Sequence, residues 1–363
     1  MRIVMVALLS LILVSCGNKT TETETTSTAD LQKTYKWKLV TTWPKNYPGL
    51  GSAPENFAKK VEAMSGGRIS IKVFGAGQLV PAFEVFDAVS QGTAQMGHGA
   101  AYYWTGKSKA AGFFTSVPFG LNAQEMNGWL HYGGGLELWR ELYAPFNLVP
   151  FAGGSTGVQM AGWFNREINS MDDIKGLKMR IPGLGGDVIT RAGGVSVTMP
   201  GGELYTSMQT GVIDATEWVG PYNDLAFGFH QVAKYYYYPG WHEPGPVLEL
   251  IVNKEAYASL PDDLQAIVEG AARAVNQDML DEYTARNNSA LVELVETHGV
   301  DVRKLPDDVI AELRRLSAEV LDELGQDSEI SGRIAESVKA FKKQAMAYHA
   351  ISEEAYYSAR KEQ

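Results

Sequence analysis

Hydrophobic and polar positions follow two alternating rhythms along most of the chain. Strand-like apolar runs at 35–42 and 68–74 alternate with helical periodicity at 54–64. The same rhythm restarts near Val158 and continues to an apolar run at Val247–Asn253. Such alternation is typical of a mostly parallel sheet with helices on its faces. We therefore expect an α/β protein with two successive α/β lobes.

The second run of alternating elements can be followed in detail. It contains short apolar segments separated by glycine, proline and amphipathic stretches. We expect strands at 158–165, 177–181, near Val195 and at 212–218, and helices at 170–175, from Asp187, after Pro200 and from Pro221.

The last third of the chain has helical periodicity alone. One helix is predicted from Asp262 to about Leu294, and at ~1.5 Å per residue it would be long enough to brace both lobes. Further helices are expected at 306–324 and 330–357. The second of these carries an apolar stripe, which would dock on the chain's own lobes or on a second copy. The stripe consists of Ile334, Val338, Phe341 and Ala345.

The N-terminus has the pattern of an export signal. Its apolar run at 3–13 is too short to span a bilayer and fits the hydrophobic region of a signal peptide. The following Leu-Val-Ser-Cys resembles a bacterial lipobox, which predicts a signal peptide at 1–15 and a lipidated Cys16. An ordinary signal with an incidental cysteine is the alternative. Residues 16–34 are rich in Thr and Glu and are expected to form a flexible tether.

Composition and charge narrow the function. The chain has 363 residues, which suggests two domains at ~150 residues each. Its net charge of −10 opposes binding to nucleic acid or anionic membranes, so the only expected membrane attachment is the lipid on Cys16. A single cysteine rules out an intrachain disulfide and a multi-thiolate metal site.

Enzyme motifs are absent from the sequence. We find no phosphate-binding loop, no complete dinucleotide fingerprint, no H-E-x-x-H and no G-x-S-x-G. The six histidines are scattered, and His98, between two glycines, is interpreted as structural rather than functional. Catalysis therefore has little support.

Candidate binding residues lie at the ends of strands predicted for the second lobe. Ligands of open α/β sheets bind beyond the carboxyl ends of the strands. Arg180 lies at such an end and could hold a carboxylate with two hydrogen bonds, or it could form a surface salt bridge. Glu217-Trp218 and Trp241-His242-Glu243 each place a tryptophan near an acid at a comparable position. Exposed acids are the alternative, but the repeated pairing favours a pocket.

Three segments carry a resemblance to a known family. They are "VSQGTAQMGHG" at 89–99, "SMDDIKGLKMRIPG" at 170–183 and "GGELYTSMQTGVIDATEWVGPYND" at 201–224. With them, residues 35–300 resemble the solute-binding proteins of tripartite ATP-independent periplasmic (TRAP) transporters, in the branch that binds 2-oxoacids. The resemblance implies a two-lobed periplasmic-binding-protein fold with a hinge and extra C-terminal helices. It assigns 35–157 plus 249–285 to lobe I, 158–248 to lobe II and 286–363 to C-terminal helices that form a homodimer by exchange.

The resemblance also implies a binding site. In that branch an arginine binds the substrate carboxylate, and a cation bridges the carboxylate and 2-oxo oxygens. Arg180 matches the arginine, while Gln159 in "GVQMAGWF", Glu217, the Trp218 carbonyl and Glu243 in "GWHEPG" match the cation ligands. Gln159 and Trp218 also belong to the implied substrate site. Further candidates for the pocket are Asn223, Tyr103, Tyr102, Trp104 and Trp43.

The expected function is that of an extracytoplasmic receptor. It would bind a small monocarboxylate, a 2-oxoacid such as pyruvate or else lactate, and deliver it to TRAP membrane subunits. Oxygen ligands suit Na⁺ or Ca²⁺, and the charges lean toward Ca²⁺ unless His242 supplies a positive charge. The alternative is an extracytoplasmic metal-dependent lyase or hydrolase with Glu217 or Glu243 as general base.

Overall fold

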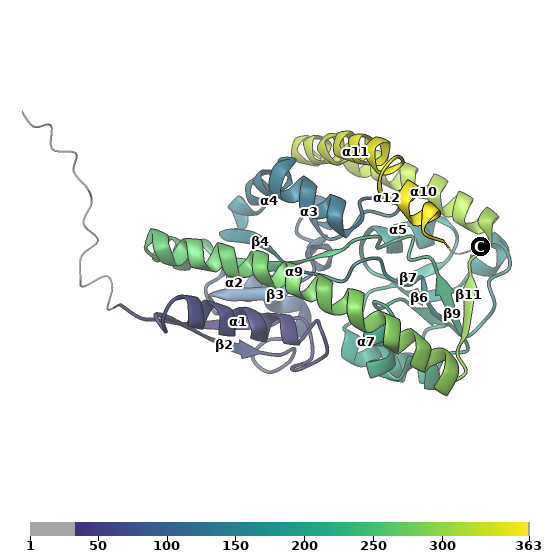
Figure 1. Ribbon diagram of the computed structural model, residues 1–363, viewed down its shortest axis with the longest axis horizontal. Coiled ribbons are helices and arrows are strands. Elements are labelled where there is room, and N and C mark those ends of the chain that lie inside the picture. The colour runs from purple at the N-terminus through teal and green to yellow at the C-terminus, as the bar shows by residue number, and fades with distance from the viewer. Residues whose placement is uncertain (1–32, 362–363) are drawn as a thin grey trace, which may run out of the picture. The chain divides into compact units, whose positions relative to one another are not determined.

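The computed structural model of the protein describes residues 33–361 (Figure 1). The predicted signal peptide at 1–15, the lipidation site Cys16 and nearly all of the predicted tether at 16–34 lie outside the described residues. Within the described part of the chain, no helix combines the length and hydrophobicity needed to cross a membrane.

The first sheet has five strands in the order β2-β1-β3-β10-β4. Strand β1 runs parallel to both β2 and β3, whereas β10 is antiparallel to β3 and β4. All seven residues of β10 are buried, as expected for a central strand with hydrophobic cores on both faces. The strands are β1 (Tyr35–Thr41), β2 (Ile69–Phe74), β3 (Met96–Gly99), β4 (Leu148–Ser155) and β10 (Val247–Asn253).

Helices cover both faces of this sheet. Alternate residues of β10 enter different cores: Leu250 packs in the core with α1 and α9, and Ile251 packs in the core with α2 and α4. Because successive side chains of a strand point to opposite faces of the sheet, the apolar run of β10 contributes to both cores. Besides α9 (Asp262–Val292), the helices that pack in or against these cores are α1 (Ser52–Met64), α2 (Val85–Ser90), α3 (Ala123–Tyr132), α4 (Gly135–Tyr143) and α8 (Lys254–Ala258).

The second sheet has six short strands in the order β11-β9-β5-β8-β6-β7. Strand β6 is parallel to its neighbours β7 and β8, and β5 is antiparallel to β8 and β9. The strands are β5 (Gly162–Phe164), β6 (Lys178–Arg180), β7 (Val195–Val197), β8 (Ala215–Thr216), β9 (Tyr235–Tyr238) and β11 (Asp301–Lys304), with helices α5 (Gly183–Arg191), α6 (Leu204–Gln209) and α7 (Pro221–Phe227). The two sheets confirm the predicted α/β fold with two lobes.

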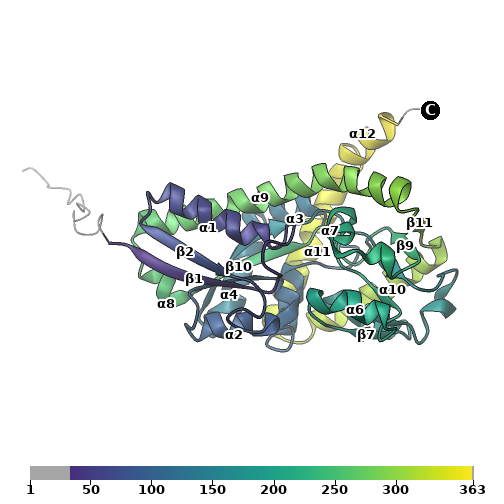
Figure 2. The same cartoon turned by 90° about the horizontal axis from the view of Figure 1, so that it is seen from below.

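Helix α9 (Asp262–Val292) runs along both lobes (Figure 2). It packs against β4 and α1 of the first lobe and against α7 of the second. Leu264, Val268, Ala271 and Val275 form its buried face and recur at helical spacing. The predicted bracing helix is therefore present, with an end close to the expected one.

The C-terminal helices lie on the rest of the chain. Helix α10 (Asp307–Gly325) packs against α5, and α11 (Glu329–His349) packs against α3, α4 and α10. Ile334 and Val338 of the predicted stripe are buried, so this stripe docks on the chain's own surface. The single helix expected at 330–357 is interrupted after His349 and resumes as α12 (Glu353–Ala359).

Several other elements differ from the sequence expectation. The strand expected at 212–218 is only two residues long (Ala215–Thr216), and the helix expected from Asp187 begins at Gly183. Strands β4, β9 and β11 and helices α3 and α4 were not predicted. The described chain also contains short 3-10 helices and one π-helical segment: η2 (Ala82–Glu84), η3 (Ala101–Trp104), η4 (Lys109–Phe114), η5 (Ala144–Phe146), η6 (Met171–Ile174), η7 (Gly201–Glu203), η8 (Phe229–Gln231) and the π-helical η9 (Glu293–Thr297).

Candidate functional site

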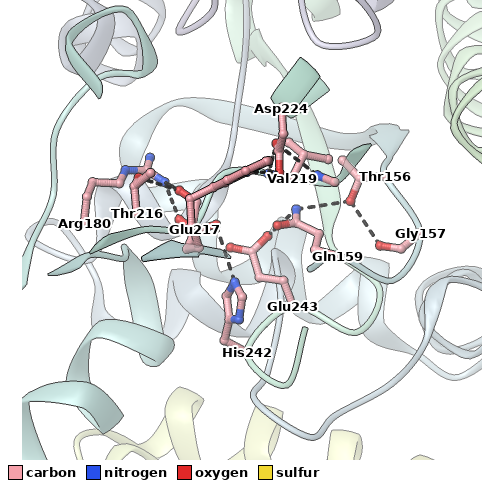
Figure 3. Close-up of polar contacts among 12 residues, drawn as sticks. Thr156, Gly157, Gln159, Arg180, Thr216, Glu217, Val219, Asp224, His242 and Glu243 are labelled. Atoms are coloured by element: carbon pink, nitrogen blue, oxygen red, sulfur yellow. Dashed lines mark hydrogen bonds and ion pairs between the residues drawn. The ribbon is translucent and has the colours of Figure 1, made fainter. Parts of the chain in front are cut away.

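Two neighbouring parallel strands bring together a buried ion pair. Arg180 is the last residue of β6 and lies opposite Thr216 of β8, so Glu217 follows at the same edge of the sheet. Arg180 Nη1 contacts Glu217 Oε1 (Figure 3). The two side chains are 1% and 0% exposed. The alternative of a surface salt bridge for Arg180 is therefore wrong.

The remaining guanidinium contacts fix the direction of Arg180. Its Nη2 donates to the hydroxyl of Tyr103 at 3.2 Å, and its Nε donates to the carbonyl of Met199 at 3.3 Å. The guanidinium also lies 5.1 Å from the ring centre of Trp218. Burial alone lowers the pKa of Arg180, but the Glu217 carboxylate outweighs it and the pKa is raised, so the side chain stays charged. Because Tyr103 belongs to the first lobe, Arg180 links the two lobes.

A second carboxylate reaches the same place from the turn before β10. Gln159 Nε2 donates to Glu243 Oε2 at 2.8 Å, and the Gln159 backbone N–H donates to the Glu243 carbonyl at 3.1 Å. The turn passes so close that a Cβ on Gly240 would come within 2.1 Å of the Gln159 carbonyl oxygen, which requires glycine there. Burial raises the pKa of Glu243 well above its usual range, and the charge of Glu217 raises it further.

The carboxylates and one histidine form a compact group. Glu217, His242 and Glu243 each offer a ligand atom, and these atoms lie within 4.8 Å of one another. His242 Nε2 is 3.4 Å from Glu217 Oε2. Among the described residues, Glu217 Oε2, Gln159 Oε1 and both ring nitrogens of His242 are buried without a hydrogen-bond partner. Buried oxygens without donors fit a hard cation, which would supply the missing positive charge.

A small cavity lies beside this group, and both lobes contribute to its walls. Trp43 of the first lobe faces Trp218 of the second, with ring centres 6.2 Å apart, and Trp43 also packs near Tyr103 at 6.1 Å. The walls are thus largely aromatic and aliphatic, with polar groups gathered at one side. The lining residues are Trp43, Leu50, Tyr102, Tyr103, Thr156, Gln159, Trp218, Val219, Glu243 and Leu248.

Six of the predicted site residues lie together. Tyr103, Gln159, Trp218 and Glu243 line the cavity, and the Arg180–Glu217 pair adjoins it through Tyr103 and Trp218. Of the open candidates, Tyr102 and Trp43 also line it. Trp104 does not, because its indole binds Glu249 instead. Four further lining residues were not expected, and nothing in their sequence context distinguishes them: Leu50, Thr156, Val219 and Leu248.

Asn223 lies elsewhere. Its Nδ2 donates to the Pro48 carbonyl at 2.8 Å, its Oδ1 accepts the hydroxyl of Tyr283, and its own carbonyl accepts the hydroxyl of Tyr47 at 2.6 Å. These contacts use the amide to join the second lobe to the first lobe and to α9. The predicted substrate contact of Asn223 therefore has no support in the geometry.

His98 behaves as its structural interpretation predicted. Trp43 Nε1 donates to His98 Nδ1 at 2.8 Å, and His98 Nε2 pairs with the Gly153 carbonyl at 3.1 Å. Burial lowers the pKa of His98 to about 4, so the ring is neutral near pH 7. Its effect on the site is indirect, through the orientation of the Trp43 indole.

Comparison with known proteins identifies relatives that share this arrangement of lobes. Residues 39–327 match the profile of the bacterial extracellular solute-binding proteins, family 7 (DctP). The chain is 44% identical to the monocarboxylate 2-oxoacid-binding periplasmic protein of Nostoc sp. over 344 residues, which cover 95% of this chain and 93% of that protein.

Two solved structures superpose closely on this protein. A TRAP solute-binding protein of Pseudoalteromonas atlantica, crystallised with sodium and pyruvate, has a TM-score of 0.88 and 42% identity, covering 91% of this chain and 100% of the other. A TRAP solute-binding protein of Bordetella bronchiseptica, a dimer with calcium and picolinate in one of its sites, has a TM-score of 0.88 and 37% identity, covering 90% and 97%. The chain described here therefore belongs to the DctP family of extracellular solute-binding proteins, the solute receptors of TRAP transporters.

Proposed function

We propose that this protein is an extracytoplasmic receptor that binds a small 2-oxo or 2-hydroxy monocarboxylate together with Na⁺ or Ca²⁺ and delivers it to TRAP membrane subunits. The observation that carries this proposal is the buried group of Arg180, Glu217 and Glu243 beside an aromatic cavity. One cationic side chain, together with a carboxylate oxygen of Glu217 and an amide oxygen of Gln159 that have no donor, matches the two parts of such a ligand complex.

In the proposed complex each polar group has one task. Arg180 binds one oxygen of the ligand carboxylate, because its buried guanidinium stays charged and is held beside the cavity by Tyr103 and Trp218. The other carboxylate oxygen and the 2-oxo oxygen bind the cation in a five-membered chelate. Glu217, Glu243, Gln159 and the Trp218 carbonyl complete its oxygen shell. Gln159 has a free Oε1 for this purpose.

The charge of the site favours a divalent cation. In the complex, where both carboxylates must be ionised to bind the cation, Arg180 contributes one positive charge, Glu217 and Glu243 contribute two negative charges, and the ligand contributes one more. The resulting charge of −2 is neutralised by Ca²⁺ and is reduced to −1 by Na⁺. The relatives include proteins with sodium and with calcium, so both cations belong in the test.

The cavity also limits what the ligand can carry beyond its acid group. Its non-polar wall comes from Trp43, Leu50 and Leu248 of the first lobe and from Trp218 of the second. A short apolar substituent fits such a wall, whereas a second carboxylate would be desolvated there without a partner. Because both lobes form the wall, separation of the lobes would open the site to solvent.

Calorimetry tests the proposal directly. Pyruvate is titrated into the protein in buffer with Ca²⁺, in buffer with Na⁺, and in buffer from which both have been removed. If the cation touches both protein and ligand, each raises the affinity of the other by the same factor. We expect pyruvate affinity to rise with either cation and cation affinity to rise equally with pyruvate. Affinity for pyruvate that is unchanged without both cations contradicts the proposed site.

A catalytic role for the same carboxylates is the alternative. It would require Glu217 or Glu243 to accept a proton from a cation-bound ligand or water. Incubation of pyruvate or lactate with the protein and Ca²⁺, followed by NMR, separates the two functions. We expect the ligand to be recovered unchanged, and turnover would favour the enzyme.

We propose further that Cys16 carries a lipid that anchors the receptor at the membrane. Support comes from the lipobox-like residues before Cys16 and from the extracellular location of the family. We expect labelled fatty acid to be incorporated into the wild type and not into Cys16→Ser, which should be released from membranes. Equal membrane retention and labelling of Cys16→Ser would contradict this attachment.

We also propose that the protein forms a homodimer through its C-terminal helices. The stripe at Ile334 and Val338 is covered by the chain itself, but a second group of large apolar side chains beyond it is at least half exposed or nearly so. This group comprises Met346, Tyr348, Ile351, Tyr356 and Tyr357, at 53%, 64%, 78%, 60% and 49% exposure. Several large apolar side chains left exposed on one short segment favour an interface.

Sedimentation equilibrium tests the dimer. The full chain without its lipid should sediment with twice the monomer mass at micromolar concentration, and Ile351→Asp with Tyr356→Asp should sediment as a monomer. A matched variant on the exposed side chain of Tyr132 should leave the mass unchanged. A monomeric wild type would reject the proposal.

A further inference from the structure

We propose that Asp224 is a positioning residue for the cation site. From outside the cavity, its carboxylate holds the backbone of residues 217–220 so that the Glu217 side chain and the Trp218 carbonyl oxygen are presented to the cation. This inference rests on the proposed function, because it concerns the same cation.

The contacts of Asp224 are directed at this backbone. Its Oδ1 accepts the N–H of Val219 at 3.2 Å (Figure 3). The same oxygen accepts the N–H of Gly220, also at 3.2 Å. Its Oδ2 accepts the indole N–H of Trp163 at 3.0 Å and the hydroxyl of Tyr236 at 2.7 Å. All four donors are neutral and point at the carboxylate. Asp224 is only 1% exposed, so no water can take over these bonds without a rearrangement.

Other hydrogen bonds hold the backbone of residues 217–219 and leave the Trp218 carbonyl oxygen without a donor. The Glu217 N–H donates to the Arg180 carbonyl at 3.1 Å, and the Val219 carbonyl accepts the Met160 N–H at 2.9 Å. The Glu217 carbonyl accepts the hydroxyl of Thr216 at 2.9 Å. Across the described residues 33–361, no hydrogen bond uses the Trp218 carbonyl oxygen. The anchors thus hold both sides of the Trp218 carbonyl and leave its oxygen for a ligand.

Removal of Asp224 would therefore act on the site through the backbone. Without its carboxylate, the buried N–H groups of Val219 and Gly220 lose their acceptor, and the segment must rearrange to satisfy them. Residues that orient cation ligands from behind typically contribute ~10–100-fold in affinity. A residue of the same network that does not touch the segment should contribute much less, and Tyr236 is such a residue.

The test combines a readout without ligand and a readout with ligand. Amide hydrogen exchange of Val219 and Gly220 is measured in the ligand-free protein, and Ca²⁺ affinity is measured by calorimetry at saturating pyruvate. We expect Asp224→Ala to accelerate both amides and to weaken Ca²⁺ binding at least ~10-fold, with pyruvate binding restored by high Ca²⁺. Tyr236→Phe, the matched control, should stay near the wild type in both readouts.

The isosteric variant keeps the test decisive if Asp224→Ala does not fold. Asp224→Asn retains one oxygen for the two N–H groups but presents an NH₂ group to Trp163, so we expect a smaller change in the same directions. Wild-type exchange or wild-type Ca²⁺ affinity in a folded Asp224 variant overturns the inference, as does an equal loss in Tyr236→Phe. A wild type that binds no pyruvate with Ca²⁺ contradicts the proposed function instead, because the exchange readout needs no ligand.

Discussion

Glu217 in the second lobe and Glu249 in the first lobe are equally buried, yet their surroundings differ. Both oxygens of Glu249 have donors: Trp104 Nε1 binds one, and the Tyr143 hydroxyl donates to the other at 2.9 Å. Glu217 has Arg180 on one oxygen and no hydrogen-bond donor on the other among the described residues. A buried carboxylate with both oxygens satisfied is complete as it stands. The unsatisfied oxygen of Glu217, which lies beside Glu243 and His242, lacks a partner that a bound cation would supply.

The comparison also extends to charge. Glu249 has only neutral donors, and burial raises its pKa to about 7. The site instead confines two carboxylates, one guanidinium and one histidine. Glu217 therefore lies among charged and ionisable side chains, whereas Glu249 contacts only neutral donors, and this difference can be tested residue by residue.

The largest effect is expected from removing the cationic side chain of the site. Arg180→Ala should lower pyruvate affinity by about 2–5 kcal/mol, because it leaves buried carboxylates and a ligand carboxylate without their partner. Arg180→Lys should also bind poorly, since one ammonium group cannot keep the contacts to Glu217, Tyr103 and Met199 and bind the ligand as well. Calorimetry measures the affinity, and circular dichroism checks the fold. Near-native affinity in folded Arg180→Ala would remove Arg180 from the proposed site.

A matched pair of substitutions tests the comparison itself. Glu217→Gln and Glu249→Gln make the same chemical change at equally buried positions. We expect Glu217→Gln to weaken cation-dependent pyruvate binding about 10- to 100-fold, or ~1.4–2.8 kcal/mol, and Glu243→Gln to act similarly. Glu249→Gln should leave the affinity unchanged. If both members of the pair weaken binding equally, an unsatisfied oxygen does not distinguish site from core.

The pH dependence of folding stability tests Glu249, the carboxylate of this pair that has donors on both oxygens. Burial raises the pKa of Glu249 to about 7 in the folded protein, against about 4.3 in an unfolded chain. The stability associated with its protonated form is thus fully present below about pH 4.3 and is lost as pH rises through about 7. Between about pH 5 and about pH 8, the wild type should lose on the order of 2 kcal/mol relative to Glu249→Gln.

Denaturant unfolding of both proteins at several pH values measures this difference. Asp224, whose pKa burial likewise raises to about 7, is present in both proteins and should cancel. If the free energy of unfolding depends on pH in the same way in the wild type and in Glu249→Gln, ionisation of Glu249 does not destabilise the folded protein.

The smallest effect is expected for an exposed carboxylate. Glu141 binds both terminal nitrogens of Arg333, at 2.5 and 2.9 Å, and ties α11 to α4. The two side chains are 50% and 48% exposed, so solvent screens the pair. Arg333→Ala should lower the melting temperature only slightly and leave pyruvate affinity unchanged. A large loss of stability would mean that this pair carries more of the docking of α11 than its exposure suggests.

The elements that the sequence predicted well have strong and unbroken patterns. Strand β10 was predicted with its observed bounds, and α9 was predicted to within a few residues of its end, because long apolar periodicity dominates local detail. The missed strands lack such a pattern. Strand β4 contains Pro150 and two glycines, and β11 is four mostly polar residues that pair at a sheet edge. Their structure depends on partners distant in the sequence.

The residues of the site likewise fall into those that the sequence pattern predicted and those that it missed. Arg180 and Glu217 were recognised because each ends a predicted strand and lies in a motif of the family. Asp224 was not singled out, because an acid in the first turn of a helix is commonly an exposed residue that favours the helix dipole. Asn223 was assigned to the pocket from the same segment but faces Pro48 and Tyr283. Sequence spacing places residues on a helix, but it does not determine what each side chain contacts.

The strand order also determines when each lobe can be completed as the chain emerges from the ribosome or the export channel. Strand β10 lies between β3 and β4 but follows most of the second lobe in sequence, and β11 joins the second sheet only after the whole of α9. A chain that ends before Val247 therefore leaves β3 and β4 with open edges, which are prone to pair with other chains. Native pairing of long sequence separation is also slow. Because of this interleaved order, both sheets can be completed only when nearly the full length of the chain is available.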